Sequence, residues 1–172
     1  MISMEDIRWL NEQEERAWRA LQFMQMRLEG ELARQLAADS GLSYPDYLVL
    51  VALTDRPDGR IRLFELAGVL GWEKSRLSHH VRRMTERGLV KKEKCNSDRR
   101  GAHVVVTTRG RAEIEAAAPG HLATVRRLFV DRLTPTQLAV IGDVGEAVLA
   151  GLDEPAAASD TAPRNVRKVG VA

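Results

Sequence analysis

Apolar residues recur at intervals of three and four over residues 5–38, which is the spacing of one face of an α-helix. The segment contains no proline, so the pattern predicts one long helix. Its apolar stripe needs a partner, either a second chain or the C-terminal helices. A second helix is expected after Ser43, which caps it, with Pro45 in its first turn. That helix is apolar almost all round as far as Leu53, which indicates that it is buried.

The pattern of apolar and polar residues changes every few residues between positions 61 and 107. A short strand is followed by a helix over residues 63–70, which ends at Gly71. A second helix runs from about Ser75 to Arg87, and two further strands follow it. This second helix is apolar on one side and cationic on the other. Two such helices joined by a short turn that contains glycine are typical of a helix-turn-helix.

The second of these helices has the composition of a DNA recognition helix. Its apolar stripe is Leu77, Val81 and Met84. The remaining polar and cationic residues are the candidates for DNA contact: Lys74, Ser75, Arg76, Ser78, His79, Arg82 and Arg83. The N-terminal part of such a helix lies deepest in the major groove, so Arg76 or His79 is expected to contact base edges. Arg82 and Arg83 lie further along the helix and are expected to contact phosphates more often than bases.

The two strands after this helix predict a hairpin, or wing. The segments LVKKEKC and AHVVVT flank the turn NSDRRG, in which Asp98 is a structural turn residue. Arg99 and Arg100 lie near the tip of the wing, and Lys94 lies on its first strand. Arginine at such a tip suits a narrow minor groove, where negative potential is concentrated.

The last part of the chain predicts two more helices and a tail. Thr107 or Thr108 caps the first, and a kink or break is expected at Pro119-Gly120. Thr134 begins a capping box for the last helix. That helix is expected to bury Leu138, Ile141, Val148 and Leu152. Residues 154–172 lack periodicity and are expected to be disordered.

Together these elements predict a mainly α-helical fold of order α-α-β-α-α-β-β-α-α, a winged helix-turn-helix between long dimerisation helices. Four regions are expected: N-terminal dimerisation and linking helices over 1–55, the DNA-binding lobe over 56–107, C-terminal dimerisation helices over 108–153, and the tail. Charge supports this division. Residues 56–111 hold 15 Lys and Arg against 6 Asp and Glu, whereas the rest holds 11 against 18. A basic lobe in an otherwise acidic chain is the electrostatic footprint of nucleic-acid binding.

Other features narrow the class of protein. The longest apolar run, residues 47–53, is too short to cross a membrane, and no signal peptide is visible. The single cysteine allows no internal disulfide, which fits the cytoplasm. No catalytic motif occurs, so neither an enzyme nor a cofactor is expected. No metal site is expected either, because His79, His80, Cys95 and His103 lack a zinc-binding spacing.

Three alternatives remain open from the residues. The winged helix could be a protein-interaction module, in which case its binding would hardly depend on salt or on DNA sequence. Cys95 lies near Lys92 and Lys94, whose charges could lower its pKa, so a redox sensor is conceivable, although a spectator thiol is favoured. A small enzyme that uses His79 or Cys95 would need a concave site with convergent polar groups.

Residues 74–110 resemble the recognition helix and wing of the MarR (multiple antibiotic resistance regulator) family. The matching features are Lys74-Ser75, Ser78, Val81, Arg83, Gly88-Leu89-Val90, Asp98-Arg99-Arg100, and Thr107 with Gly110. His79 and His80 stand where the family more often has an arginine followed by an apolar residue. The weaker resemblance extends over residues 7–152. It implies a homodimer on a palindromic operator of double-stranded DNA, with Arg100 in the minor groove. It also implies a ligand-responsive repressor with a pocket for a small aromatic or phenolic effector.

Overall fold

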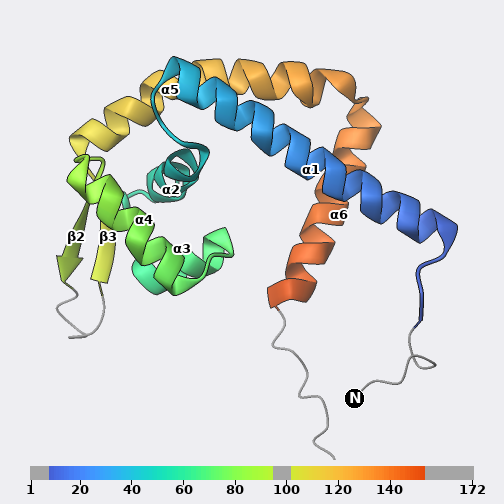
Figure 1. Ribbon diagram of the computed structural model, residues 1–172, viewed down its shortest axis with the longest axis horizontal. Coiled ribbons are helices and arrows are strands. Elements are labelled where there is room, and N and C mark those ends of the chain that lie inside the picture. The colour runs from blue at the N-terminus through green and yellow to red at the C-terminus, as the bar shows by residue number, and fades with distance from the viewer. Residues whose placement is uncertain (1–7, 95–101, 154–172) are drawn as a thin grey trace, which may run out of the picture. The chain divides into compact units, whose positions relative to one another are not determined.

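The computed structural model describes residues 8–94 and 102–153. The elements in chain order are α1 (Glu12–Asp39), α2 (Tyr44–Thr54), β1 (Arg60–Arg62), α3 (Leu63–Leu70), α4 (Lys74–Glu86), β2 (Val90–Lys94), β3 (Ala102–Val106), α5 (Thr108–Leu128), the 3-10 turn η2 (Val130–Arg132) and α6 (Pro135–Asp153). This order confirms the predicted fold class (Figure 1). Contacts divide the chain into two units, residues 1–129 and residues 130–172, and each is described by itself below.

α1 begins later than the apolar periodicity predicts. The periodicity places its start at Glu5, but the helix starts at Glu12. Asn11 is its N-cap and forms a capping box with Glu14, in which each side chain accepts a hydrogen bond from the other residue's backbone N–H. These bonds satisfy donors that a helix start otherwise leaves unpaired, so the cap rather than the apolar spacing fixes the boundary.

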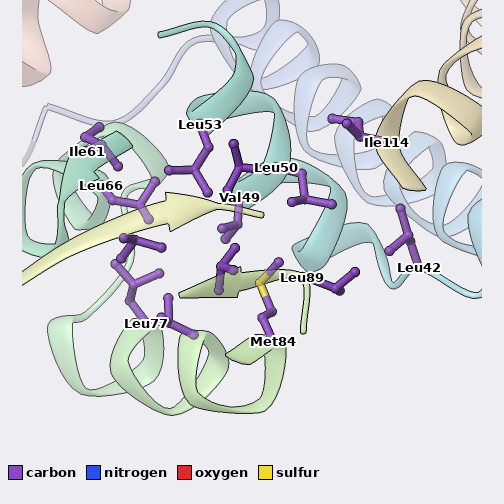
Figure 2. Close-up of a cluster of buried hydrophobic side chains, with 14 of the residues drawn as sticks. Leu42, Val49, Leu50, Leu53, Ile61, Leu66, Leu77, Met84, Leu89 and Ile114 are labelled. Atoms are coloured by element: carbon purple, nitrogen blue, oxygen red, sulfur yellow. The ribbon is translucent and has the colours of Figure 1, made fainter. Parts of the chain in front are cut away.

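The core lies between the small sheet and the helices that cover it. The strand order is β1-β3-β2, all antiparallel, with Ile61 opposite Val104 and Val90 opposite Val106. In Figure 2, side chains from α2, α4 and the strands converge in one cluster. Its members at 0% exposure include Leu50, Leu77 and Met84. The burial predicted for the apolar stripe of α4 is therefore confirmed.

α5 continues through its proline. A kink or break was expected at Pro119-Gly120, and the break was wrong, because the helix is continuous from Thr108 to Leu128. Proline removes one backbone hydrogen bond, but α5 packs against both α1 and α2. Ala117 and Thr124 are buried in this part of α5, so tertiary packing holds the helix together across the proline.

The predicted burial of Leu138, Ile141, Val148 and Leu152 on α6 does not occur within the single chain, and their burial in a dimer stays a prediction. Three of these side chains are exposed, Leu152 at 74%, and Leu138 is half-buried. The helix begins as predicted, because Thr134 and Gln137 exchange hydrogen bonds at its start. An apolar periodicity predicts a buried face without stating which chain covers it. The predicted disordered tail lies outside the described residues.

Gly110 fixes how closely α5 approaches the end of the winged helix. Thr107, the N-cap of α5, donates a hydrogen bond from its hydroxyl to the Gly88 carbonyl and accepts one from the Gly110 N–H. A Cβ atom on Gly110 would overlap the carbonyl oxygen of Leu89 and press against Leu50. The position therefore requires glycine for space rather than for backbone conformation.

We predict that Gly110→Ala lowers the free energy of unfolding by about 1–3 kcal/mol, since the added methyl group forces the backbone to shift. Gly68→Ala is the matched control, because Gly68 is also helical but has nothing within 4 Å of an added Cβ. That control is expected to gain about 0.5–1 kcal/mol from the higher helix propensity of alanine. Urea unfolding measures both. A Gly110→Ala protein as stable as the wild type would contradict the packing described.

Candidate nucleic-acid interface

The two helices of the helix-turn-helix are joined by a tight turn with a left-handed residue. Gly71 caps α3 at φ +62°, a conformation that glycine adopts without strain. The next residue, Trp72, donates a backbone hydrogen bond to Ala67. This turn ends α3 and lets α4 begin at Lys74 in a new direction.

α4 separates its buried and exposed residues as the sequence predicts. The buried residues are Leu77, His80, Val81 and Met84. The structure brings most of the predicted DNA-contacting residues together on the opposite, exposed side: Lys74, Ser75, Arg76, His79, Arg82 and Arg83. Ser78 is only half-buried and lies at the edge of this group. We call this exposed set of residues the cationic face of α4.

Several arginines of the cationic face have local partners. The Arg76 guanidinium lies 4.5 Å from the centre of the Trp72 ring, a cation–π contact that restrains the side chain near the start of α4. Arg82 Nε lies 3.8 Å from a carboxylate oxygen of Glu86, one helical turn further on. Nη2 of Arg83 lies 3.1 Å from Nδ1 of the buried His80. Sequence reasoning missed Trp72, although an aromatic residue four positions before an arginine was a usable signal.

The strands of the wing are present, and its tip is not among the described residues. β2 and β3 pair from Val90 opposite Val106 to Lys94 opposite Ala102. Lys94 is exposed at the end of β2. The predicted wing residues Asp98, Arg99 and Arg100 lie outside the described residues, as does Cys95. Their roles therefore stay predictions.

A buried carboxylate beneath α4 was not foreseen from the sequence. Asp46 is 2% exposed and lies in the first turn of α2, where its carboxylate accepts a hydrogen bond from the N–H of the N-cap, Ser43. Its Oδ2 also accepts a bond of 2.6 Å from Nη1 of Arg87, which ends α4, and its Oδ1 lies 3.0 Å from Nε2 of His80. Nη2 of Arg87 donates to the Gly41 carbonyl as well. Asp46 therefore ties α2 to α4 at two points.

These contacts control the charge of Asp46. Burial alone would raise the pKa of the carboxyl group, but the His80 imidazole, the Arg87 guanidinium and the Ser43 N–H outweigh burial. They hold the pKa of Asp46 well below its usual range. The carboxylate is therefore charged at neutral pH.

A cavity lies between α1, α2 and the turn before α4. Its volume is about 630 Å³, and it is lined by both apolar and polar side chains, among them Leu32, Tyr44, Trp72 and Arg76. Arg76 therefore belongs both to the wall of this cavity and to the cationic face of α4.

Within residues 8–94 and 102–153, no group of three or more His, Cys, Asp or Glu could hold a metal ion. No described helix has the length and hydropathy needed to span a membrane.

These features define the class of protein: a helix-turn-helix with a cationic second helix and a following strand pair is a winged-helix DNA-binding fold. Comparison with known proteins agrees. The family model of the MarR family matches residues 40–101. No curated protein sequence matches the chain.

Solved structures extend the match to most of the chain. Sco3205, a MarR family transcriptional regulator from Streptomyces coelicolor solved in complex with DNA, is 38% identical, with a TM-score of 0.82 over 91% of this chain and 98% of that one. AbsC, a MarR family transcriptional regulator from the same organism, is 37% identical, with a TM-score of 0.79 over 85% of this chain and 98% of AbsC. CouR from Rhodococcus jostii RHA1, bound to p-coumaroyl-CoA, is 25% identical, with a TM-score of 0.67 over 75% and 88% of the two chains. The chain belongs to the MarR family of transcriptional regulators and is a DNA-binding regulator. Regulators of this family are transcription factors and not enzymes.

We predict that Asp46→Asn lowers the free energy of unfolding at pH 7 by about 2–4 kcal/mol, because Arg87 and His80 lose a charged partner in a buried setting. A carboxylate whose pKa is lowered on folding stabilises the protein at pH values above the pKa that the carboxylate has in the unfolded chain. That stabilisation is lost as the pH falls through the folded-state pKa. The wild type should therefore lose stability below about pH 4, and Asp46→Asn should lose less over the same range.

Urea unfolding between pH 7 and pH 3 measures both effects. The control is Asp58→Asn, since the Asp58 carboxylate is mostly exposed, lies 3.6 Å from Nε of Arg60, and accepts a hydrogen bond from the Arg60 N–H that the asparagine oxygen can also accept. It should behave as the wild type does. An equal loss of stability with acid in the wild type and in Asp46→Asn would show that Asp46 is not a stabilising charge.

Proposed function

We propose that this regulator is a homodimeric repressor that binds a palindromic operator through α4 in the major groove. The observation that carries this proposal is the cationic face of α4, which is held outward by a fully buried stripe on the opposite side of the same helix. A helix of this kind, placed second in a helix-turn-helix, is the element that enters the major groove. The DNA complex of Sco3205 supports the same use of the fold.

The residues of this interface divide into two roles. Arg76 and His79 near the start of α4 would contact base edges, with Arg76 most suited to a guanine. The rest would position the protein on phosphates: Lys74, Ser75, Ser78, Arg82, Arg83, Lys94 and Arg99. Arg100 would enter the minor groove, and Asp98 would shape the turn that presents it. The lobe over residues 56–107 would thus bind DNA while the helices before and after it form the dimer.

Exposed apolar side chains support a homodimer. Trp18 and Phe23 on α1 and Val148 and Leu152 on α6 are each more than half exposed in the single chain. Exposed apolar surface of this extent marks protein–protein contacts. A two-fold dimer would also place two α4 helices on two half-sites of one palindrome. Sedimentation of the full chain as a monomer at micromolar concentration would contradict the proposal.

The cavity beside α4 supports regulation by a small ligand. CouR, which has the same fold, was solved bound to p-coumaroyl-CoA, the thioester of a phenolic acid. The cavity here offers the ring of Trp72 for stacking and the guanidinium of Arg76 for an anionic group. A small phenolic or aromatic acid bound there would engage Arg76 and lower operator affinity. Release of labelled operator in a screen of such acids tests this, and Trp72→Ala should abolish the response. A screen in which no aromatic acid releases the operator would contradict it.

Selection of bound sequences from random DNA is the experiment that tests the function. We expect a palindrome with two half-sites about one helical turn apart. Arg76→Ala should relax the base preference at one symmetric pair of positions and weaken binding by about 1–3 kcal/mol. Arg82→Ala should weaken all sequences about equally and reduce the salt dependence, since it removes a phosphate contact.

Arg34→Ala is the control, because this exposed arginine lies on α1 beside Glu31 and away from α4. It should bind as the wild type does. Selection that yields no consensus, with binding that is indifferent to salt, would favour a protein-interaction module. An unchanged base preference in Arg76→Ala, together with an altered one in Arg82→Ala, would reverse the two roles.

A further inference from the structure

His80 is the polar member of the buried side of α4. It is 7% exposed and lies in the same stripe as Leu77, Val81 and Met84, which are fully buried. A buried imidazole is costly unless its nitrogens have partners. Here the two nitrogens face partners on opposite sides: Nε2 lies 3.0 Å from Oδ1 of Asp46, and Nδ1 lies 3.1 Å from Nη2 of Arg83.

The identity of these partners fixes the role of each nitrogen. A guanidinium can only donate hydrogen bonds, so Nδ1 must be the acceptor and carries no proton. In the neutral ring the proton then resides on Nε2, which lies beside a carboxylate that can only accept but makes no aligned hydrogen bond with it. The Trp72 ring makes a T-shaped contact with the same imidazole, 5.5 Å away between centroids. His80 therefore has one tautomer that suits both of its polar neighbours.

The anchor of this arrangement does not lie on α4. Asp46 belongs to α2, and its carboxylate is already held by the Ser43 N–H and by Arg87. The core beneath α2 fixes Asp46, Asp46 orients the His80 ring, and the ring holds one end of the Arg83 guanidinium. Arg83 itself is exposed and lies three residues after His80, at the border of the cationic face.

We propose that His80 is a positioning residue for DNA binding: it restrains the Arg83 guanidinium on the flank of α4, ready for a phosphate. An unrestrained arginine loses much of its rotamer freedom when it binds. Restraint before binding removes part of that loss, and the remaining donors of the guanidinium stay available to DNA. This inference rests on the proposed role of Arg83 as a phosphate contact. His80 itself touches no DNA.

The test is a double-mutant cycle between His80 and Arg83, read as affinity for the selected operator and as the slope of affinity against salt. His80→Leu removes the acceptor while keeping an apolar side chain of similar size. We expect it to weaken binding by about three- to tenfold when Arg83 is present, and by less than twofold in Arg83→Ala. Arg83→Ala should reduce the salt slope by about one, since it loses a phosphate contact, whereas His80→Leu should leave the slope nearly unchanged, since the Arg83 charge still reaches the phosphate.

His80→Gln is the conservative variant, because its amide offers one donor for Asp46 and one acceptor for Arg83. It should restore most of the affinity that His80→Leu loses, with the salt slope of the wild type. Equal losses from His80→Leu with and without Arg83 would show a role in folding alone and would overturn the inference. Failure of His80→Gln to restore binding, with unfolding curves that match the wild type, would also overturn it.

A wrong proposed function would give a different result from a wrong positioning role of His80. If the wild type binds no duplex in a salt-dependent way, the DNA-binding interface proposed for α4 is wrong. If the wild type binds but Arg83→Ala binds equally well, Arg83 makes no contact and only the positioning role of His80 fails. Thermal unfolding of each variant, with binding measured well below its midpoint, separates both results from loss of structure.

Discussion

The arrangement of this DNA-binding lobe depends on one buried carboxylate. The Asp46 carboxylate accepts a hydrogen bond from the N–H of Ser43, the N-cap of α2, and contacts the middle of α4 through His80 and its end through Arg87. A charge removed from water is tolerated only when it is paired, so the buried carboxylate depends on these contacts. The direction in which α4 presents its cationic face is therefore set by a residue that touches no DNA.

The same helix has to satisfy two opposite requirements. Its apolar stripe, Leu77, Val81 and Met84, packs into a core shared with α2 and the strands. Its cations have to remain on the surface, where repulsion between them opposes folding. Local partners reduce that repulsion without removing the charges, as Trp72 does for Arg76 and Glu86 does for Arg82. The contacts that a DNA duplex would use are thus partly organised before it arrives.

The sequence predicted the local features and missed the long-range ones. Helical spacing, with a glycine just past the C-terminal end of each helix, located α3 and α4, because those signals are confined to a few neighbouring residues. The capping box at Asn11 was overlooked because apolar spacing continues across it. The link between Asp46 and Arg87 could not be predicted, since the two residues are 41 positions apart and meet only after folding. The apolar face of α6 was predicted as part of a dimerisation helix, and the single chain leaves most of that face exposed.

Photo-cross-linking tests most directly whether the cationic face of α4 is the surface that meets DNA. A photo-reactive amino acid would replace Ser75, which is exposed at the start of α4, and in a second protein Ala116, which is exposed on α5. Irradiation with a labelled operator should cross-link the DNA to position 75 and leave position 116 unlinked. Cross-linking at position 116 with none at position 75 would contradict the assignment of α4 as the recognition helix.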